Sequence, residues 1–172
     1  MDNYIVINGK KVELTPEQLK ALGIEAKKKS PFERTGDKFY KIDSCDKICE
    51  TIDIGFVNDM EIHYSKNLFN IANYCTDKDL LQQQAYRETL NRLLWRFSME
   101  HDGDKIDWNN ECTHKHFIYY SHMSNEWKNN YYHFDKHFGV VYFYTSEAAK
   151  QAIEEIVKPF IKTHPDFNYK GE

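Results

Sequence analysis

Two stretches of the sequence resemble each other, and this repeat constrains the fold more than any other feature. The stretches "NYCTDKDLLQQQA" and "YFYTSEAAKQAIE" align with Thr76 over Thr145, an offset of 69 residues. In each, an aromatic-rich segment ends at a Thr that can cap a helix, and an acidic residue in the first turn favours the helix dipole. Three predicted strands precede each junction: "FYKID", "ICETIDI" and "LFNIANYC" before the first, and "HFIYYSH", "WKNNYYHF" and "VVYFYT" before the second. The repeat therefore predicts two βββα copies, over residues 36–113 and 114–172.

The helix of each copy carries an apolar stripe of the kind that packs against a sheet. The first stripe has the spacing i, i+3, i+4, i+7 and consists of Leu90, Leu93, Leu94 and Phe97. The second helix, about Ser146 to Phe160, has five apolar residues on one side: Ala149, Ala152, Ile153, Ile156 and Val157. Its Pro159 falls near the end, where a break is tolerated. These stripes predict an α+β main domain, residues 36–172, with mainly antiparallel strands and two helices on one face. The alternative is two unrelated halves whose match at the junctions is accidental.

A small arm is predicted before the main domain. The opening "YIVINGKKVEL" has two β-rich runs around Asn8-Gly9, a strong hairpin signal. In "TPEQLKALG", Thr15 and Gln18 can form a capping box, Pro16 suits the first helical turn, and Gly23 can end the helix. The residues that follow mix charge, Pro and Gly without periodicity, as linkers do. We therefore predict a ββα arm and linker over residues 1–35.

The charge distribution disfavours direct nucleic-acid binding. The chain has a net charge of −4, and residues 39–113 hold 14 acidic against 8 basic side chains. A phosphate backbone is bound chiefly by clustered Lys and Arg. In the linear sequence the only such cluster is Lys27-Lys28-Lys29, in the linker. What remains open is a local basic patch that forms only in three dimensions.

Composition also sets the expected location. A chain of 172 residues that is 41% hydrophobic can bury one sizeable core and hardly two. No apolar run approaches the roughly 20 residues of a membrane span, and the start lacks the pattern of a secretory signal. We therefore expect a cytoplasmic protein with no membrane partner. Its four cysteines, Cys45, Cys49, Cys75 and Cys112, are then expected to be reduced thiols.

The stretch "HDGDKIDWNNE" raises the question of a metal or binding site. It contains Asp102, Asp104, Asp107, Trp108 and Glu111. Carboxylates suit a hard cation, but the spacing is wrong for the twelve-residue calcium loop. A Trp flanked by carboxylates and amides is typical of a protein interface. These five residues are therefore the predicted partner-binding site, against the alternatives of a solvated loop and of a Trp that belongs to the core.

The stretch "CTHKHF" offers zinc ligands. Cys112, His114 and His116 alternate, so on a strand they share one face. Structural zinc sites usually use closer pairs, and eight His in the chain make chance groupings easy. We therefore expect ordinary strand residues, no metal and no cofactor. No paired nucleophile, catalytic Lys or Gly-rich phosphate loop indicates an enzyme.

Aromatic residues in "SHMSNEWKNNYYHF" permit two interpretations. Trp127, Asn129, Tyr131 and Tyr132 could contact the bases of a single strand. Aromatic residues also stabilise cross-strand pairs in antiparallel sheets. The second interpretation is favoured, because such pairs are common in any sheet of this composition.

Four stretches carry a resemblance to a known group of proteins. "SPFERTGDKFYKID", "NIANYCTDKDLLQQQA", "LNRLLWRFSMEHDGDKIDWNN" and "VVYFYTSEAAKQAIEEI" resemble small proteins carried by phages and prophages of gut Firmicutes. The resemblance covers nearly the whole chain and brings no catalytic residues with it. It implies a mobile-element accessory protein, a class that includes inhibitors of host defence such as anti-CRISPR proteins. We therefore expect a non-enzymatic inhibitor that binds a CRISPR-Cas nuclease; the alternatives are a nucleic-acid-binding protein and a phage structural or assembly protein.

Overall fold

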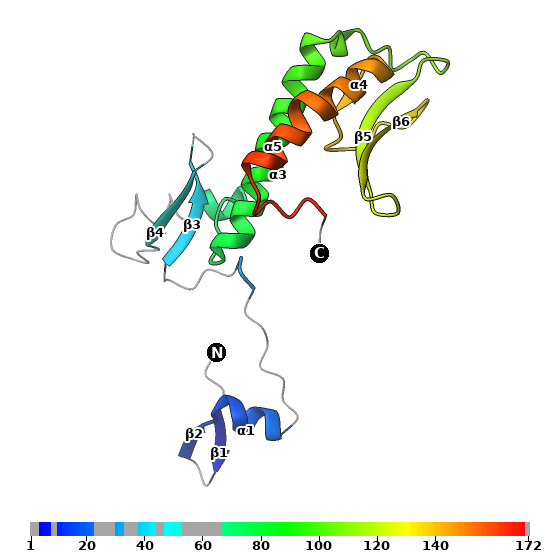
Figure 1. Cartoon of the computed structure of the whole chain (residues 1–172). Coiled ribbons are helices and arrows are strands. Elements are labelled where there is room, and N and C mark those ends of the chain that lie inside the picture. The colour runs from blue at the N-terminus through cyan, green and yellow to red at the C-terminus, as the bar shows by residue number, and fades with distance from the viewer. Residues whose placement is uncertain are drawn as a thin grey trace.

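The computed structural model describes residues 4–7, 10–22, 30–32, 38–43, 47–52 and 67–170 (Figure 1). Over these residues it combines helices with short antiparallel sheets, so the predicted α+β class is confirmed. The strands form separate sheets rather than one continuous sheet. None of the helices in the described part of the chain is long and apolar enough to cross a membrane.

The N-terminal arm has the predicted hairpin and helix. Strands β1 (Tyr4–Ile7) and β2 (Lys10–Glu13) pair antiparallel, and α1 (Pro16–Ala21) follows. The capping box is present: the Thr15 N–H donates to Gln18 Oε1 at 2.8 Å, and the Gln18 N–H donates to Thr15 Oγ1 at 3.3 Å. The turn residues Asn8-Gly9, the expected helix end at Gly23 and the three lysines of the linker lie outside the described residues. In Figure 1 the arm is set apart from the other helices.

The first predicted copy begins with a hairpin of strands β3 (Lys38–Ile42) and β4 (Ile48–Ile52). A third strand at "LFNIANYC" was expected, and that expectation is wrong for most of its length. Residues 67–70 form a helical turn, and Ala72 adopts the left-handed conformation (φ 58°), which ends any extended run. Only Cys75 pairs with the hairpin, through two hydrogen bonds to Tyr40 of 2.7 and 3.1 Å.

Next to the Cys75 pair, the side chain of Asn73 makes the hydrogen bonds to Ile42 that the backbone of a third strand would otherwise make. The Asn73 amide accepts from the Ile42 N–H at 2.6 Å and donates to the Ile42 carbonyl at 2.8 Å. Phe39, Leu68 and Tyr74 form the small core beneath it, with the Phe39 and Tyr74 rings stacked at 4.3 Å. The first copy is thus a hairpin with one extra backbone pair.

The second copy has all three predicted strands. Strands β5 (Lys115–Ser121) and β6 (Glu126–Tyr132) form a hairpin, and β7 (Tyr142–Phe143) pairs with the other edge of β5. The order β6-β5-β7 matches the order β4-β3-Cys75 of the first copy. In both copies the added segment pairs with the first strand of the hairpin and leads directly into a helix.

The two helix starts differ from the sequence alignment by one residue. Thr145 caps α4 as predicted, because its hydroxyl accepts from the Ala148 N–H at 3.1 Å. The cap of α3 is Asp77 and not Thr76, which corrects the predicted pairing of Thr76 with Thr145. Asp77 Oδ1 accepts from the Leu80 N–H at 3.0 Å, whereas the Thr76 hydroxyl donates to the Pro31 carbonyl at 3.0 Å. With Asp77 placed over Thr145, the paired residues Cys75 and Phe143 also coincide.

Helix α3 (Lys78–Glu100) runs from the first sheet to the second and buries the predicted stripe. Leu90 and Phe97 are buried, and Leu93 and Leu94 are half-buried against the same cores. Phe97 packs with Phe143 of β7 and with three alanines of α4: Ala148, Ala149 and Ala152. The side of α3 that bears this stripe therefore faces both the sheet and the second helix.

The second helix is longer than predicted and changes its pitch. It comprises α4 (Ser146–Ala152), a π-helical turn (Ile153–Val157) and α5 (Lys158–Thr163), so it continues beyond the expected end at Phe160. In Figure 1 it lies alongside α3. Of the apolar stripe, Ile156 is only half-buried, whereas Val157 is completely buried. Pro159 is accommodated directly after the π turn.

Candidate functional site: an acidic and aromatic surface

The acidic loop, residues 102–111, begins with a close turn at the end of α3. Asp102 adopts the left-handed conformation (φ 64°), and Gly103–Lys105 form a single 3-10 turn. Gly103 is buried so tightly that a Cβ there would lie 2.7 Å from the carbonyl oxygen of Ser98. The conformation of Asp102 and the close packing of Gly103 therefore fix the direction in which the acidic loop leaves α3.

The four carboxylates predicted for the site all lie at the surface. Asp102, Asp104, Asp107 and Glu111 are exposed. Lys105 forms an ion pair with Asp102 at 2.7 Å, and the hydrogen bond and charge of Asp102 raise the pKa of Lys105. One lysine within the loop thus offsets one of four carboxylates, and the loop stays strongly acidic.

Trp108 attaches the acidic loop to the sheet. Its ring is half-buried and lies edge-on to the ring of Tyr142 in β7, with centroids 5.0 Å apart and an interplanar angle of 87°. The ammonium of Lys136 lies 4.8 Å from the centre of the indole. Trp108 therefore has a packing role and still presents part of its ring at the surface.

A buried lysine fixes the far end of the acidic loop. Lys115, the first residue of β5, has no solvent-exposed surface. Its ammonium donates to the carbonyls of Asn110 at 2.6 Å and His133 at 2.8 Å. Lys115 thus joins the acidic loop to the segment that follows β6.

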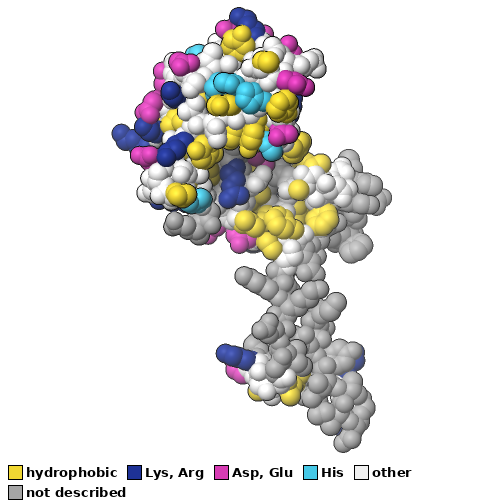
Figure 2. All heavy atoms as spheres, turned by 90° about the vertical axis from the view of Figure 1, so that its right-hand side faces the viewer, with side chains coloured by type: hydrophobic (Ala, Val, Ile, Leu, Met, Phe, Trp, Pro, Cys, Tyr) yellow, Lys and Arg dark blue, Asp and Glu magenta, His cyan; other side chains and the backbone are white. Residues whose placement is uncertain are grey.

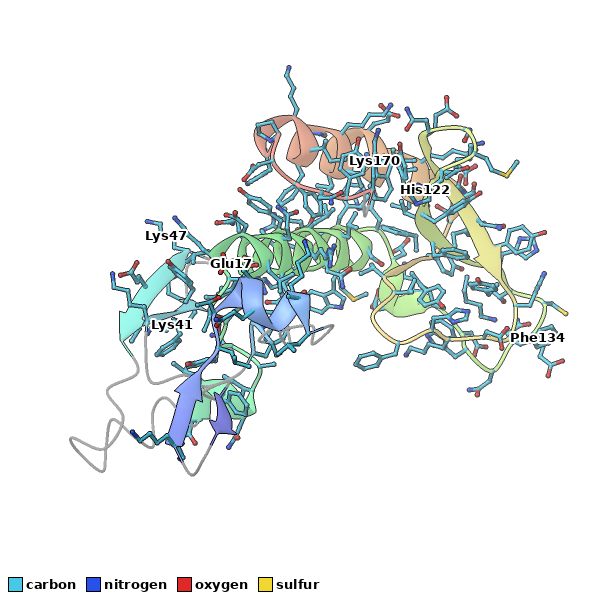
Figure 3. All side chains as sticks on the ribbon, turned by 90° about the horizontal axis from the view of Figure 1, so that it is seen from below. Glu17, Lys41, Lys47, His122, Phe134 and Lys170 are labelled. Atoms are coloured by element: carbon cyan, nitrogen blue, oxygen red, sulfur yellow. The ribbon has the colours of Figure 1, made fainter. Side chains whose placement is uncertain are left out.

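That following segment, residues 134–140, brings exposed aromatic side chains to the acidic loop. Lys136 contacts Trp108, and the His137 N–H donates to the Tyr142 hydroxyl at 2.9 Å. Phe134 is 69% exposed and Phe138 completely exposed. Figure 3 shows Phe134 at the outer end of the molecule, directed away from the helices.

Phe134 and Phe138 are not among the site residues predicted from the sequence. The signal that could have identified them is "HFDKHFGVV", where two Phe stand among His, Asp and Lys directly before a Gly. Gly139 has φ +77°, which marks a turn beside Phe138. An exposed Phe at a turn does not contribute to the hydrophobic core. Exposed hydrophobic residues that gather into a patch mark interaction surfaces.

The histidines beside this surface form ring stacks. His114 stacks on Tyr131 with centroids 4.0 Å apart, and its centroid lies 5.9 Å from that of His116. Burial and the nearby His114 lower the pKa of His116. Cys112 is a free and exposed thiol. Within the described part of the chain, no three His, Cys, Asp or Glu side chains gather as a metal site would require.

Comparison with protein-family models, with curated proteins and with solved structures found no match for this chain. Its function must therefore be inferred from the surface itself. That surface combines four exposed carboxylates, a half-buried Trp and two exposed Phe on two loops held together by Lys115 and Tyr142.

Proposed function

We propose that this chain is a non-enzymatic accessory protein of a phage or prophage that acts in the cytoplasm of the host. It inhibits a host-defence system by binding the effector protein, in the manner of an anti-CRISPR protein that binds a CRISPR-Cas nuclease. Its contact surface is the acidic loop, residues 102–111, together with the exposed aromatic residues of the segment 134–140. The observation that carries the proposal is the exposure of Phe134 and Phe138 on a segment whose Lys136 contacts Trp108 of the acidic loop.

The chemistry of this surface suits the nucleic-acid groove of a nuclease. Exposed carboxylates can occupy the positions of phosphates and attract a groove rich in Lys and Arg. Aromatic side chains contribute the apolar contact that dominates binding energy at the centre of an interface. Phe134 and Phe138 can supply this contact, because few packing contacts hold them in the free protein. Association should therefore be fast at low salt and weaker at high salt.

The experiment uses the full chain with an affinity tag in a bacterial host that carries an active CRISPR-Cas system. Proteins that co-purify are identified, and DNA cleavage by the purified effector is measured with and without the chain. The first variant replaces Asp102, Asp104 and Asp107 by Lys; the second replaces Phe134 and Phe138 by Ser. All five side chains are exposed, and thermal unfolding of each variant verifies that it is folded before inhibition is compared.

A matched control carries the same charge change elsewhere. Glu17, Asp79 and Glu155 are exposed residues of α1, α3 and the second helix that belong neither to the acidic loop nor to the 134–140 segment. Their replacement by Lys should leave inhibition intact, whereas both surface variants should lose most of it. Equal inhibition by the triple Lys variant at Asp102, Asp104 and Asp107 would exclude the acidic loop as the contact surface. Self-association in size-exclusion chromatography without any effector bound would favour a structural or assembly role.

A further inference from the structure

A cleft lies where the β5–β6 hairpin, α5 and the C-terminal segment meet. It consists of two hollows, of about 550 and 290 Å³. Both are lined by Trp127 of β6 and Tyr169 of the C-terminal segment, so the two hollows adjoin at this ring pair. The larger hollow by itself is in the size range of sites for small organic ligands. The cleft uses none of the residues of the acidic loop.

Aromatic rings form one wall of the cleft. Trp127 and Tyr169 have centroids 5.7 Å apart, and Tyr120 lies edge-on to both at 5.4 and 5.2 Å. All three residues are half-buried, so each ring presents part of its surface to the cleft. Tyr120 is opposite Trp127 in the strand register, as expected for a cross-strand pair. Tyr169 is supplied by a distant segment and extends this pair into a platform.

Basic side chains border the same platform. Lys158 and Lys162 of α5 line the larger hollow, and Arg87 of α3 lines the smaller one. The ammonium of Lys170 lies about 6 Å from the rings of Tyr120 and Tyr169 (5.9 and 6.0 Å). Figure 3 shows Lys170 and His122 on the same side of the molecule, and Figure 2 shows basic, acidic, His and hydrophobic side chains interspersed over the face that it presents.

The acidic groups near the cleft leave a positive excess. Glu126 is the one carboxylate that lines it among the described residues, and Glu154 pairs with Lys158. Lys162, Lys170 and Arg87 form no ion pair with any described carboxylate. The cleft is thus a local basic patch within an acidic protein, formed by residues far apart in the sequence.

One hydrogen-bond donor in the cleft is unused. The Nε1 of Trp127 is inaccessible to solvent and has no partner within the described structure. A buried N–H without an acceptor is costly, and native proteins usually satisfy such groups. This N–H is closed to a ligand in the cleft, so Trp127 contributes to the cleft through the exposed part of its ring alone.

We propose that this cleft binds a nucleotide unit of single-stranded nucleic acid. A base contacts the Tyr120, Trp127 and Tyr169 platform, and the phosphates lie toward Lys162, Lys170 and Arg87. Base stacking on aromatic rings combined with a basic groove is the usual chemistry of single-strand binding. Duplex DNA does not fit, because its bases are already stacked on one another. This site is independent of the proposed contact with a nuclease, and either can fail alone.

The charge component is tested with fluorescently labelled eight-residue oligo(dT) and oligo(U), by fluorescence anisotropy at several salt concentrations. The double variant Lys162→Glu, Lys170→Glu should bind much more weakly than the unmodified chain. The control Lys78→Glu, Lys150→Glu makes the same charge change on exposed residues elsewhere and should bind nearly as well as the unmodified chain. If each cleft lysine contacts one phosphate, their loss should reduce the slope of log affinity against log salt by about 1.4.

The stacking component is tested by substitutions that keep or remove the rings. Tyr120→Phe and Tyr169→Phe retain the ring and should preserve binding. Tyr120→Leu and Tyr169→Leu should each weaken binding by roughly 5- to 150-fold, the range for loss of one base–aromatic contact. Urea unfolding of the same samples identifies any Leu variant that is destabilised. If a Leu variant is destabilised, the Lys162→Glu, Lys170→Glu variant still tests binding in this cleft, because those lysines are exposed or half-buried.

The outcomes distinguish the sources of the nucleotide. Binding of oligonucleotides but not of AMP or UMP indicates a nucleic-acid strand, and binding of the mononucleotides as well indicates a small-molecule site of the same chemistry. Equal affinity for a duplex, or equal binding by the Lys162→Glu, Lys170→Glu variant and its control, would overturn the proposal. So would the absence of binding by every probe at 50 mM salt or below.

Discussion

The buried ammonium of Lys115 is predicted to be a main determinant of how the acidic loop is held. Replacement by Met keeps the length and apolar volume of the side chain but removes the hydrogen bonds to Asn110 and His133. Each hydrogen bond from a charged donor contributes about 1.5–3 kcal/mol. Relief of the cost of burying the charge offsets part of this loss. We therefore expect Lys115→Met to lower the free energy of unfolding by about 2–4 kcal/mol.

The assay is urea unfolding, with far-UV circular dichroism as the signal. For a chain of this size, the expected loss corresponds to a decrease in melting temperature of roughly 5–15 °C. Hydrogen exchange should also become faster in residues 103–112, because their attachment to the sheet is weakened. The control Lys150→Met removes an exposed lysine and should stay within about 0.5 kcal/mol of the unmodified chain. An unchanged midpoint for Lys115→Met would refute the reasoning, since the two carbonyls would then not depend on this donor.

Three further predictions concern other parts of the fold. Asp77→Ala should destabilise by about 1 kcal/mol because it removes the cap of α3; a loss seen instead only with Thr76→Ala in thermal unfolding would restore the original alignment. Gly103→Ala should cost about 1–3 kcal/mol in urea unfolding, because its Cβ would collide with the carbonyl of Ser98; a neutral result would mean that the turn is looser than described. The pKa of His116 is lowered in the folded state, so its contribution to stability is complete above pH 6.5 and is lost as the pH falls. His116→Phe should therefore flatten the decline in urea midpoint between pH 7 and pH 5, and an identical decline would contradict this assignment.

The elements that sequence predicts well are those specified by local chemistry. The capping box of Thr15 and Gln18 requires only neighbouring residues, and the stripe that includes Leu90 and Phe97 reflects the period of a single helix. The third strand of the first copy fails for the opposite reason. Its aromatic residues favour a strand, but the Asn73 side chain bonds to Ile42, 31 residues away, and replaces a backbone rung. No local pattern contains that contact.

The candidate site was predictable only in part for the same reason. The acidic residues adjoin one another in sequence, so the loop that holds Asp104 and Trp108 could be recognised from composition. Its neighbours could not, because Phe138 reaches that surface through contacts of its segment with Trp108 and Tyr142. The cleft is a stronger example, since Arg87 and Tyr169 meet at one hollow from opposite parts of the chain. A count of charges along the sequence cannot find a patch assembled in this way.

The π turn at Ile153–Val157 makes the length of the second helix as important as its composition. The Lys158 N–H bonds to the Ile153 carbonyl, five residues back, so the turn holds one residue more than an α-helical turn would. That extra residue rotates the following segment by about a quarter turn relative to a continuous α-helix, with Val157 completely buried and Ile156 half-buried against the same cores. The orientation of the residues after the π turn depends on this rotation, and so do the contacts of Phe160 and Phe167 under the cleft. Single-residue deletions and insertions are therefore the changes this helix tolerates least, whereas the exposed residues of the turn itself, such as Glu154, can vary in side chain at little cost.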